Sequence, residues 1–270
     1  MQTGVPLTSS RSLRLVRASI LGLVILAGMY ALRIGPSTTN ATYISWPAVF
    51  NDVVGGPAFL VVVALAAAIA GLPLAVAMRE RWPAHLRTRT TVRSWIISEV
   101  LWRSVAVAAV VAVCILVCGL VVFGWVAPRS SGLVDPSGYG EPDEVARMVD
   151  GSYPLYAAAG RSSAGFVVLS ALWAGLHAGL IALMSALTAL LIRNRVLALL
   201  APAVLLVGAS IGLELTVGPA AAPLITWVHP GGLLPSNLIA AAIPGLTLGL
   251  ACGAMAVVLL RRAPQMDRFS

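Results

Sequence analysis

Few side chains in the long apolar stretches of this chain could take part in chemistry. His177 lies near the middle of one stretch, and Glu214 lies near the end of the next. A charge at the centre of a lipid bilayer costs several kcal/mol, so polar residues there are where function would show. His177 and Glu214 are therefore candidates for a substrate path. The plainer alternatives are a structural histidine and an interfacial carboxylate.

The three cysteines predict neither a disulfide framework nor a metal site. Cys114 and Cys118 share a helix face at i and i+4, and Cys252 stands alone in a later stretch. No histidine or carboxylate ligand lies near them in the sequence. We interpret all three as small packing residues.

The sequence also predicts no catalytic centre. The run Gly208-Ala209-Ser210-Ile211-Gly212 faintly resembles the serine motif of rhomboid proteases, but Ile211 replaces a glycine and His177 precedes the serine. Paired metal-binding histidines, an acidic phosphotransfer motif and a Gly-rich phosphate loop are all missing from the sequence. We expect a chain that is not an enzyme and holds no cofactor or metal; any ATP would be bound by another protein.

Six long apolar stretches position these residues. They cover residues 15–35, 57–78, 104–128, 164–192, 196–217 and 237–260. At about 1.5 Å rise per residue, each can cross a hydrocarbon core of roughly 30 Å, where helix satisfies the backbone. Hydrophobic residues make up 59% of the 270-residue chain and charged residues only 10%, which leaves no separate soluble domain. We expect an all-α, multi-pass membrane protein with six transmembrane helices in one domain, residues 1–270.

The arginines predict the orientation of this domain. Fourteen of the eighteen basic residues lie before or in the first turn of the first stretch, between the second and third, between the fourth and fifth, or after the sixth. By the positive-inside rule both termini are cytoplasmic, and the first stretch is a retained signal anchor. The net charge of +8 then records orientation and not nucleic-acid binding. All basic residues are Arg, which fits the plasma membrane of a high-GC bacterium.

Two segments on the outer side differ in character. Residues 129–163 are rich in Gly, Ser and Pro, and we expect an extracellular loop too short for its own core. Residues 217–236 are apolar but broken by proline and glycine. A re-entrant segment and an interfacial hairpin anchored by Trp227 are both open interpretations.

Small residues and prolines predict how the helices meet. Glycines recur at four-residue spacing, which lets helices approach closely in lipid. They are Gly175 and Gly179, Gly208 and Gly212, and the ladder Gly245, Gly249 and Gly253. Packing within one subunit is the preferred interpretation for the pairs; for the ladder, a seam with another subunit is equally open. Pro73, Pro202 and Pro244 should each remove a backbone hydrogen bond and allow a bend.

The connector after the second stretch is basic and amphipathic. Pro83 can open a helix, and the apolar residues can rest on the membrane or on a partner. The residues that we single out in it are Arg79, Glu80, Arg81, Leu86, Arg87, Arg89, Arg93 and Trp95. An anchor on lipid headgroups and a docking site for a protein are the two interpretations.

This connector resembles that of the membrane subunits of ABC-2 type transporters. There it opens with an acidic residue, continues to an arginine before the third span, and contains a coupling helix that docks into an ATPase. Glu80, Leu86, Thr88 and Arg93 stand at matching places, while Glu99 occupies the area where that family often has a lysine. Family members also carry short re-entrant helices between the fifth and sixth spans, as residues 217–236 would.

The resemblance implies the permease subunit of an ATP-binding cassette exporter, with a coupling loop at about residues 79–103. Such a subunit works with a second copy or a related permease and with cytoplasmic ATPases that bind the ATP. A secondary carrier and a non-transporting immunity, sensor or assembly protein are the alternatives. The sequence does not indicate a substrate.

Overall fold

A computed structural model describes residues 42–55, 58–79, 92–130, 132–192, 194–218 and 238–266. These residues are almost entirely helical, and among them only an isolated bridge between Tyr43 and Val134 has strand-like pairing. The longer helices are α6 (Val92–Gly119), α9 (Ser163–Leu191), α10 (Arg195–Thr216) and α12 (Leu238–Met266). The prediction of an all-α membrane chain is confirmed at this level.

Among the described residues, four helices are long and apolar enough to cross a membrane. They are Ser94–Arg129, Ser163–Leu191, Val196–Thr216 and Ala242–Arg261. The second predicted stretch forms a continuous run of α3 (Ala58–Ala66), the π-helical turn η1 (Ala67–Gly71) and α4 (Leu72–Arg79), whose apolar part, Val62–Met78, is shorter than these four. The first predicted stretch, 15–35, lies outside the described residues. The structure thus supports a membrane-embedded chain, with four of the six predicted spans identified.

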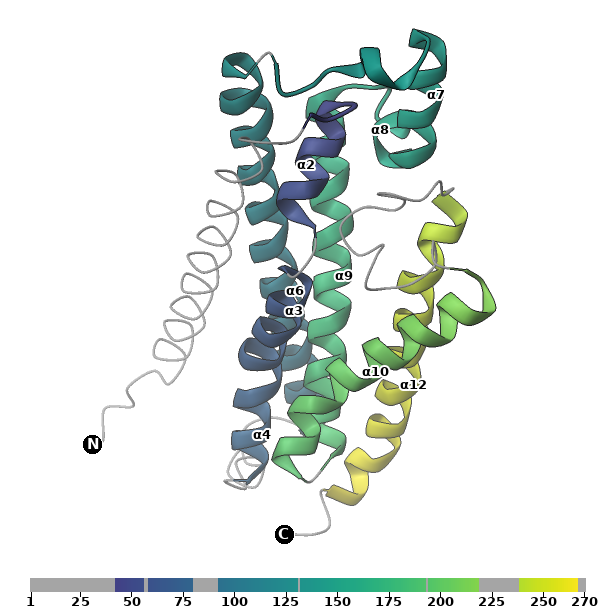
Figure 1. The fold of residues 1–270 in the computed structure, drawn as a ribbon. Helices are drawn as coiled ribbons and strands as arrows, with labels where there is room; N and C mark the ends of the chain where they lie inside the picture. The colour runs from purple at the N-terminus through teal and green to yellow at the C-terminus, as the bar shows by residue number, and fades with distance from the viewer. Residues whose placement is uncertain are drawn as a thin grey trace, which may run out of the picture.

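Helix α9 occupies the centre of the bundle. It packs along α6, with α3, η1 and α4 on one side and α10 and α12 on the other (Figure 1). At the α6 contact, a Cβ built at Gly175 would lie 3.0 Å from the carbonyl oxygen of Ala108, and one at Gly179 would lie 3.1 Å from the Cβ of Ala108. The close approach predicted for this glycine pair is confirmed.

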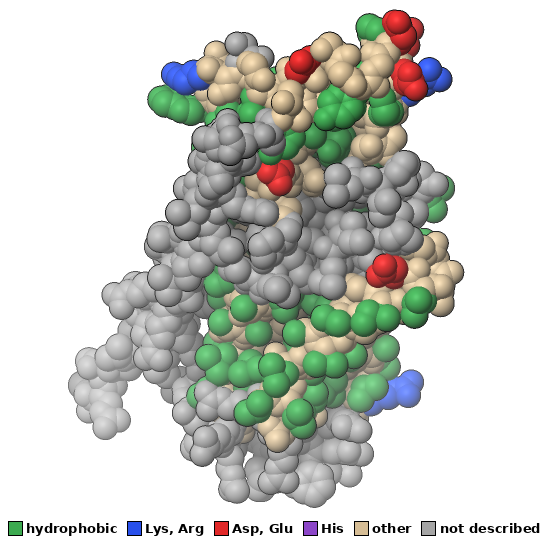
Figure 2. Space-filling view, viewed as in Figure 1, with side chains coloured by type: hydrophobic (Ala, Val, Ile, Leu, Met, Phe, Trp, Pro, Cys, Tyr) green, Lys and Arg blue, Asp and Glu red, His purple; other side chains and the backbone are tan. Residues whose placement is uncertain are grey.

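The outer flanks of the bundle are apolar. In the space-filling view, apolar side chains cover the side formed by α10 and α12, while charged side chains gather mainly at the ends (Figure 2). A Cβ at Gly208 or Gly212 on α10 would meet no described atom within 4 Å. This second glycine pair therefore makes no close contact within the described part of the subunit, contrary to the preferred interpretation.

The segment from 129 to 163 contains more structure than the sequence suggested. It follows the π-helical end of the third span, η2 (Leu120–Val126), and η3 (Ala127–Arg129), and it contains η4 (Pro136–Tyr139), α7 (Pro142–Ser152) and α8 (Pro154–Ala158). Val145 and Val149, one turn apart on α7, pack with Tyr153 into a small apolar cluster. That the segment is an extracellular loop without a core of its own stays a prediction; within it, the amphipathic helix α7 buries its apolar face against residues in and next to α2 (Trp46–Val54).

Two backbone hydrogen bonds and two aromatic ring contacts hold this end to the bundle. The Tyr43 N–H donates to the Leu133 carbonyl at 2.9 Å, and the Asp135 N–H donates to the Tyr43 carbonyl at 3.0 Å. Phe166, at the start of α9, contacts the rings of Phe50 and Tyr156, each with centroids 5.5 Å away. We call α2, α7, α8 and their connections the cap.

The cap lies at one end of the bundle. The end of α4, the start of α6 and the ends of α9 and α12 lie at the other (Figure 1). The arginine-bearing ends of these helices therefore share one side, in the alternation that the sequence predicts. On the positive-inside interpretation, that side faces the cytoplasm.

Candidate functional site at a proline kink

The π-helical turn in the second stretch has an identifiable cause. Pro73 has no N–H for the carbonyl of Ile69, four residues earlier, and its ring clashes with that carbonyl in a regular helix. Immediately before Pro73 the chain widens into η1, where the Leu72 N–H bonds to the carbonyl of Ala67, five residues back. The Ile69 carbonyl has thereby lost its usual α-helical donor.

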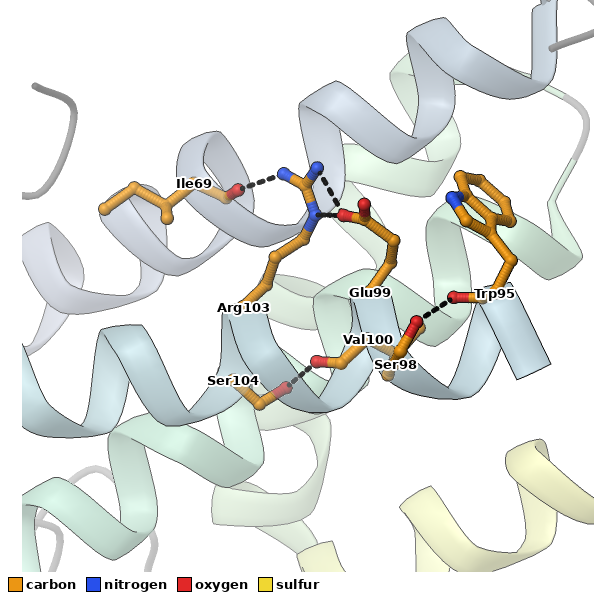
Figure 3. A network of polar contacts seen from close by, with 7 residues as sticks. All are labelled: Ile69, Trp95, Ser98, Glu99, Val100, Arg103 and Ser104. Carbon is orange, nitrogen blue, oxygen red and sulfur yellow. Dashed lines mark hydrogen bonds and ion pairs between the residues drawn. The ribbon is translucent and has the colours of Figure 1, made fainter. Parts of the chain in front are cut away.

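A side chain from α6 donates to this carbonyl. Arg103 Nη1 donates to the Ile69 oxygen at 3.3 Å, across from the neighbouring helix (Figure 3). The remainder of the guanidinium faces Glu99, one turn earlier on α6: Nε and Nη2 donate to the same Oε2 atom at 3.0 and 2.9 Å. Arg103 therefore connects a carboxylate of its own helix to the kink of another.

The Glu99–Arg103 pair is well shielded from solvent. The side chains are 11% exposed for Arg103 and 19% for Glu99. Removing one partner of a fully buried pair typically costs about 3–5 kcal/mol, because the other charge is left uncompensated. With this residual exposure, a value toward the lower end of that range is expected. The pair therefore holds the Arg103 guanidinium in place on α6, from where its Nη1 reaches the Ile69 carbonyl.

A second proline shows the same arrangement. Pro202 lies inside α10 and cannot donate to the carbonyl of Ala198, four residues earlier. Thr188 of α9 lies 3.1 Å from that oxygen through its Oγ1, which also lies 3.1 Å from the Ser185 carbonyl. The hydroxyl is buried, so this contact holds α10 to α9 next to the turn that joins them.

His177 lies between α9 and α12. It is 1% exposed, and its Nδ1 is 2.9 Å from the Trp173 carbonyl, which assigns the ring proton to Nδ1. Its Nε2 has no hydrogen-bond partner among the described residues and would lie 3.3 Å from a Cβ built at Gly245. Glu214 is exposed on α10, and no contact joins it to His177 in the described structure. The two candidates for a substrate path are thus not brought together.

Most of the predicted connector lies outside the described residues: Glu80, Arg81, Leu86, Arg87 and Arg89. Arg79 ends α4, and Arg93 lies in the first turn of α6. Since α6 begins at Val92, residues 92–103 of the predicted loop are the first turns of a long helix.

Trp95 is one of the connector residues that the structure describes. It is partly buried against the core, and its Nε1 is buried without a hydrogen-bond partner in the described part of the chain. Its carbonyl accepts a hydrogen bond from the Ser98 hydroxyl at 3.0 Å (Figure 3). Trp95 therefore helps to pack α6, and its contact with a partner stays a prediction.

The glycine ladder of α12 divides between two environments. Gly245 contacts His177, whereas a Cβ at Gly249 or Gly253 would meet no described atom within 4 Å. Cys252, seven residues after Gly245, also faces α9, and its Sγ donates to the Leu180 carbonyl at 3.6 Å. Among the three glycines of the ladder, only Gly245 therefore packs closely against another helix of the described subunit.

The remaining chemistry of the described residues is sparse. Cys114, Cys118 and Cys252 are buried free thiols, as expected of packing residues, and no group of three or more potential metal ligands occurs among the residues described.

Comparison with protein-family models, with curated proteins and with solved structures found no match to this chain.

Sequence reasoning identifies the backbone hydrogen bond lost at Pro73 but misses the Arg103 contact. It treats Arg103 only as an orientation signal, and Glu99 only as a departure from a family pattern. A signal is present in the i, i+4 spacing of this acid and base at the foot of an apolar helix. This spacing could indicate a neutralised ion pair that enters the membrane. It does not indicate that Arg103 would contact the Ile69 carbonyl.

Proposed function

We propose that this chain is the permease subunit of an ATP-binding cassette exporter of the ABC-2 type. One observation supports this function most directly. The connector between α4 and α6 joins two helices that Arg103 and Glu99 hold together next to a kink. A push on the connector would therefore act on two membrane helices at once.

The length of the third span adds support. The helix from Ser94 to Arg129 has 36 residues, about 54 Å at 1.5 Å per residue, against a hydrocarbon core of roughly 30 Å. It can project beyond the bilayer and carry force from a cytoplasmic partner. A rigid lever at the end of a basic connector suits ATP-driven rocking of membrane helices, in which ATP favours one conformation over another.

In this proposal the chain is not itself an enzyme. A separate cytoplasmic ATPase binds and hydrolyses ATP, and a second copy or a related permease completes the membrane part in the bacterial plasma membrane. The connector residues that meet the ATPase in this proposal are Arg79, Glu80, Arg81, Leu86, Arg87, Arg89, Arg93 and Trp95. Arginines can pair with carboxylates around a docking cleft, and Leu86 can fill it.

The test is co-purification with an ATP-binding cassette protein encoded beside this chain. We expect the ATPase to bind, and Leu86→Asp to release it while the permease stays inserted in the membrane. Met148→Asp is the matched control, since Met148 is a 38% exposed residue of the cap on the opposite end. Leu86 is preferred to Trp95, because Trp95→Asp would also disturb helix packing.

The other outcomes decide against the proposal. Retention of the ATPase by Leu86→Asp at the wild-type level would make the connector a headgroup anchor. Substrate movement in liposomes without any ATPase would indicate a secondary carrier. An ATPase that binds but is never stimulated, with no transported substrate, would indicate a sensor or assembly protein.

A further inference from the structure

Two prolines in this bundle each leave a carbonyl without its helical donor, and a neighbouring helix supplies a donor to both. Pro73 cannot donate to the Ile69 carbonyl, which accepts a hydrogen bond from Arg103. Pro202 cannot donate to the Ala198 carbonyl, which accepts one from Thr188. Buried backbone carbonyls are almost always hydrogen-bonded, and these side chains supply a donor in place of the one that proline lacks.

The two contacts differ in kind. Thr188 and Ala198 are only 10 residues apart, and their contact is neutral and local to the α9–α10 turn. Arg103 and Ile69 are 34 residues apart, on opposite sides of the connector, and the donor carries a charge that Glu99 balances. The ionic contact is therefore the one that links the connector to a kink.

We propose that Arg103 and Glu99 form a latch on the hinge at η1. In the latched state, Arg103 replaces the N–H that Pro73 lacks and fixes the bend between α3 and α4. In the released state, Arg103 remains paired with Glu99 on α6, and the Ile69 carbonyl gives up its inter-helix donor, so that α4 can pivot. Single π-helical turns in longer helices are frequent at functional sites.

The geometry explains why the released state is accessible. The bond to Ile69 is 3.3 Å long, whereas the two bonds to Glu99 are 2.9 and 3.0 Å. Charge-assisted hydrogen bonds are usually about 2.7–2.9 Å, so the contact across the helices is the weaker one. Breaking it does not separate the ion pair, which avoids an uncompensated charge. The latch is independent of any ATPase and stands whether or not the proposed function does.

A double-mutant cycle on thermal unfolding tests the latch. Arg103→Met removes the donor, and Pro73→Ala restores a backbone N–H at position 73. We expect Arg103→Met to lower the unfolding temperature by about 6–12 °C in the wild-type background and by clearly less in the Pro73→Ala background. The cost of removing the positive charge beside Glu99 is common to both backgrounds and cancels in the cycle.

A second measurement distinguishes a latch from packing alone. Hydrogen exchange of the amides in η1 and α4 should rise selectively in Arg103→Met, while exchange in α9 is unchanged. The double variant with Pro73→Ala should return exchange in α4 toward wild type. A purely structural loss would raise exchange across the bundle and would not be reversed.

The cycle has its own control. The changes in unfolding temperature of Thr188→Val and Pro73→Ala should be additive, because the Thr188 hydroxyl contacts the Ala198 carbonyl and not that of Ile69. If Arg103→Met does not fold, Arg103→Lys replaces it, since Lys keeps the charge but loses the fork that spans both partners. An additive cycle for position 103, or unchanged exchange in α4, would overturn the latch.

Discussion

Replacing a glycine by alanine at the contact between α6 and α9 adds one methyl group and tests how closely these two helices pack. Gly175 and Gly249 share the same sequence context of small residues at four-residue spacing, but their surroundings differ. A Cβ at Gly175 would lie 3.0 Å from the Ala108 carbonyl and 3.1 Å from the Ala112 Cβ, whereas one at Gly249 meets no described atom. Gly→Ala at both sites therefore isolates the cost of that contact.

The expected magnitudes follow from two opposing effects. Alanine is favoured over glycine inside a helix by about 1 kcal/mol at either site. Overpacking at a close contact costs about 1–3 kcal/mol, and at Gly175 the nearest atom is backbone that cannot turn aside. Gly249→Ala should be neutral or slightly stabilising, and Gly175→Ala should be less stable than it by about 2 kcal/mol.

The assay is thermal unfolding of the purified protein in one detergent, followed by helical circular dichroism. For a chain of this size, about 2 kcal/mol corresponds to a difference of roughly 4–8 °C between the two variants. Gly179→Ala, whose Cβ would lie 3.1 Å from that of Ala108, should lie between them. Equal unfolding temperatures for Gly175→Ala and Gly249→Ala would refute the proposed packing of α6 on α9.

Three further predictions concern the outer face, the cap and the orientation. Gly249→Leu should leave the unfolding temperature of the subunit unchanged but weaken assembly with a second membrane subunit; normal oligomer size and activity would place this face towards lipid. Burial and the nearby Asp52 raise the pKa of Tyr153 from 10 to about 12. The stability that this tyrosine gives the cap is therefore complete below pH 10 and is lost as the pH rises to about 12. Ultraviolet difference spectra that show Tyr153 titrating near pH 10 in the folded protein would contradict this prediction. Reporter fusions after Arg89 and Arg268 should be cytoplasmic, and those near Gly140 and Pro230 external; an external signal at Arg89 would overturn the orientation.

The sequence predicts the position of the long helices well, because an apolar run of about 20 residues has few alternatives to a helix. The stretch predicted at 164–192 forms Ser163–Leu191, and that at 196–217 forms Arg195–Thr216. The third helix begins earlier than expected, at Val92, since pairing of Glu99 with Arg103 lets polar turns continue into the apolar part. Periodicity in apolar residues alone does not detect such turns.

The sequence does not predict which element lies opposite a residue. Gly175 and Gly249 have similar neighbours in the chain, yet only the first meets another helix among the described residues. Pro73 predicts a free carbonyl at Ile69, but the donor comes from 34 residues away and depends on how α6 packs. The cap was missed because its apolar cluster combines residues from α7 with Ile44 and Ala48, too far apart in sequence to be recognised as one core.

The proposal that the connector couples this chain to an ATPase is tested most directly by site-specific crosslinking. A photo-crosslinking residue is placed at position 86 of the connector, and another at position 148 of the cap as the control. We expect the first to crosslink to the co-expressed cytoplasmic ATPase, with a yield that changes when ATP is added, and the second to give no such product. Crosslinks from position 86 to lipid alone, with or without ATP, would contradict the proposed function.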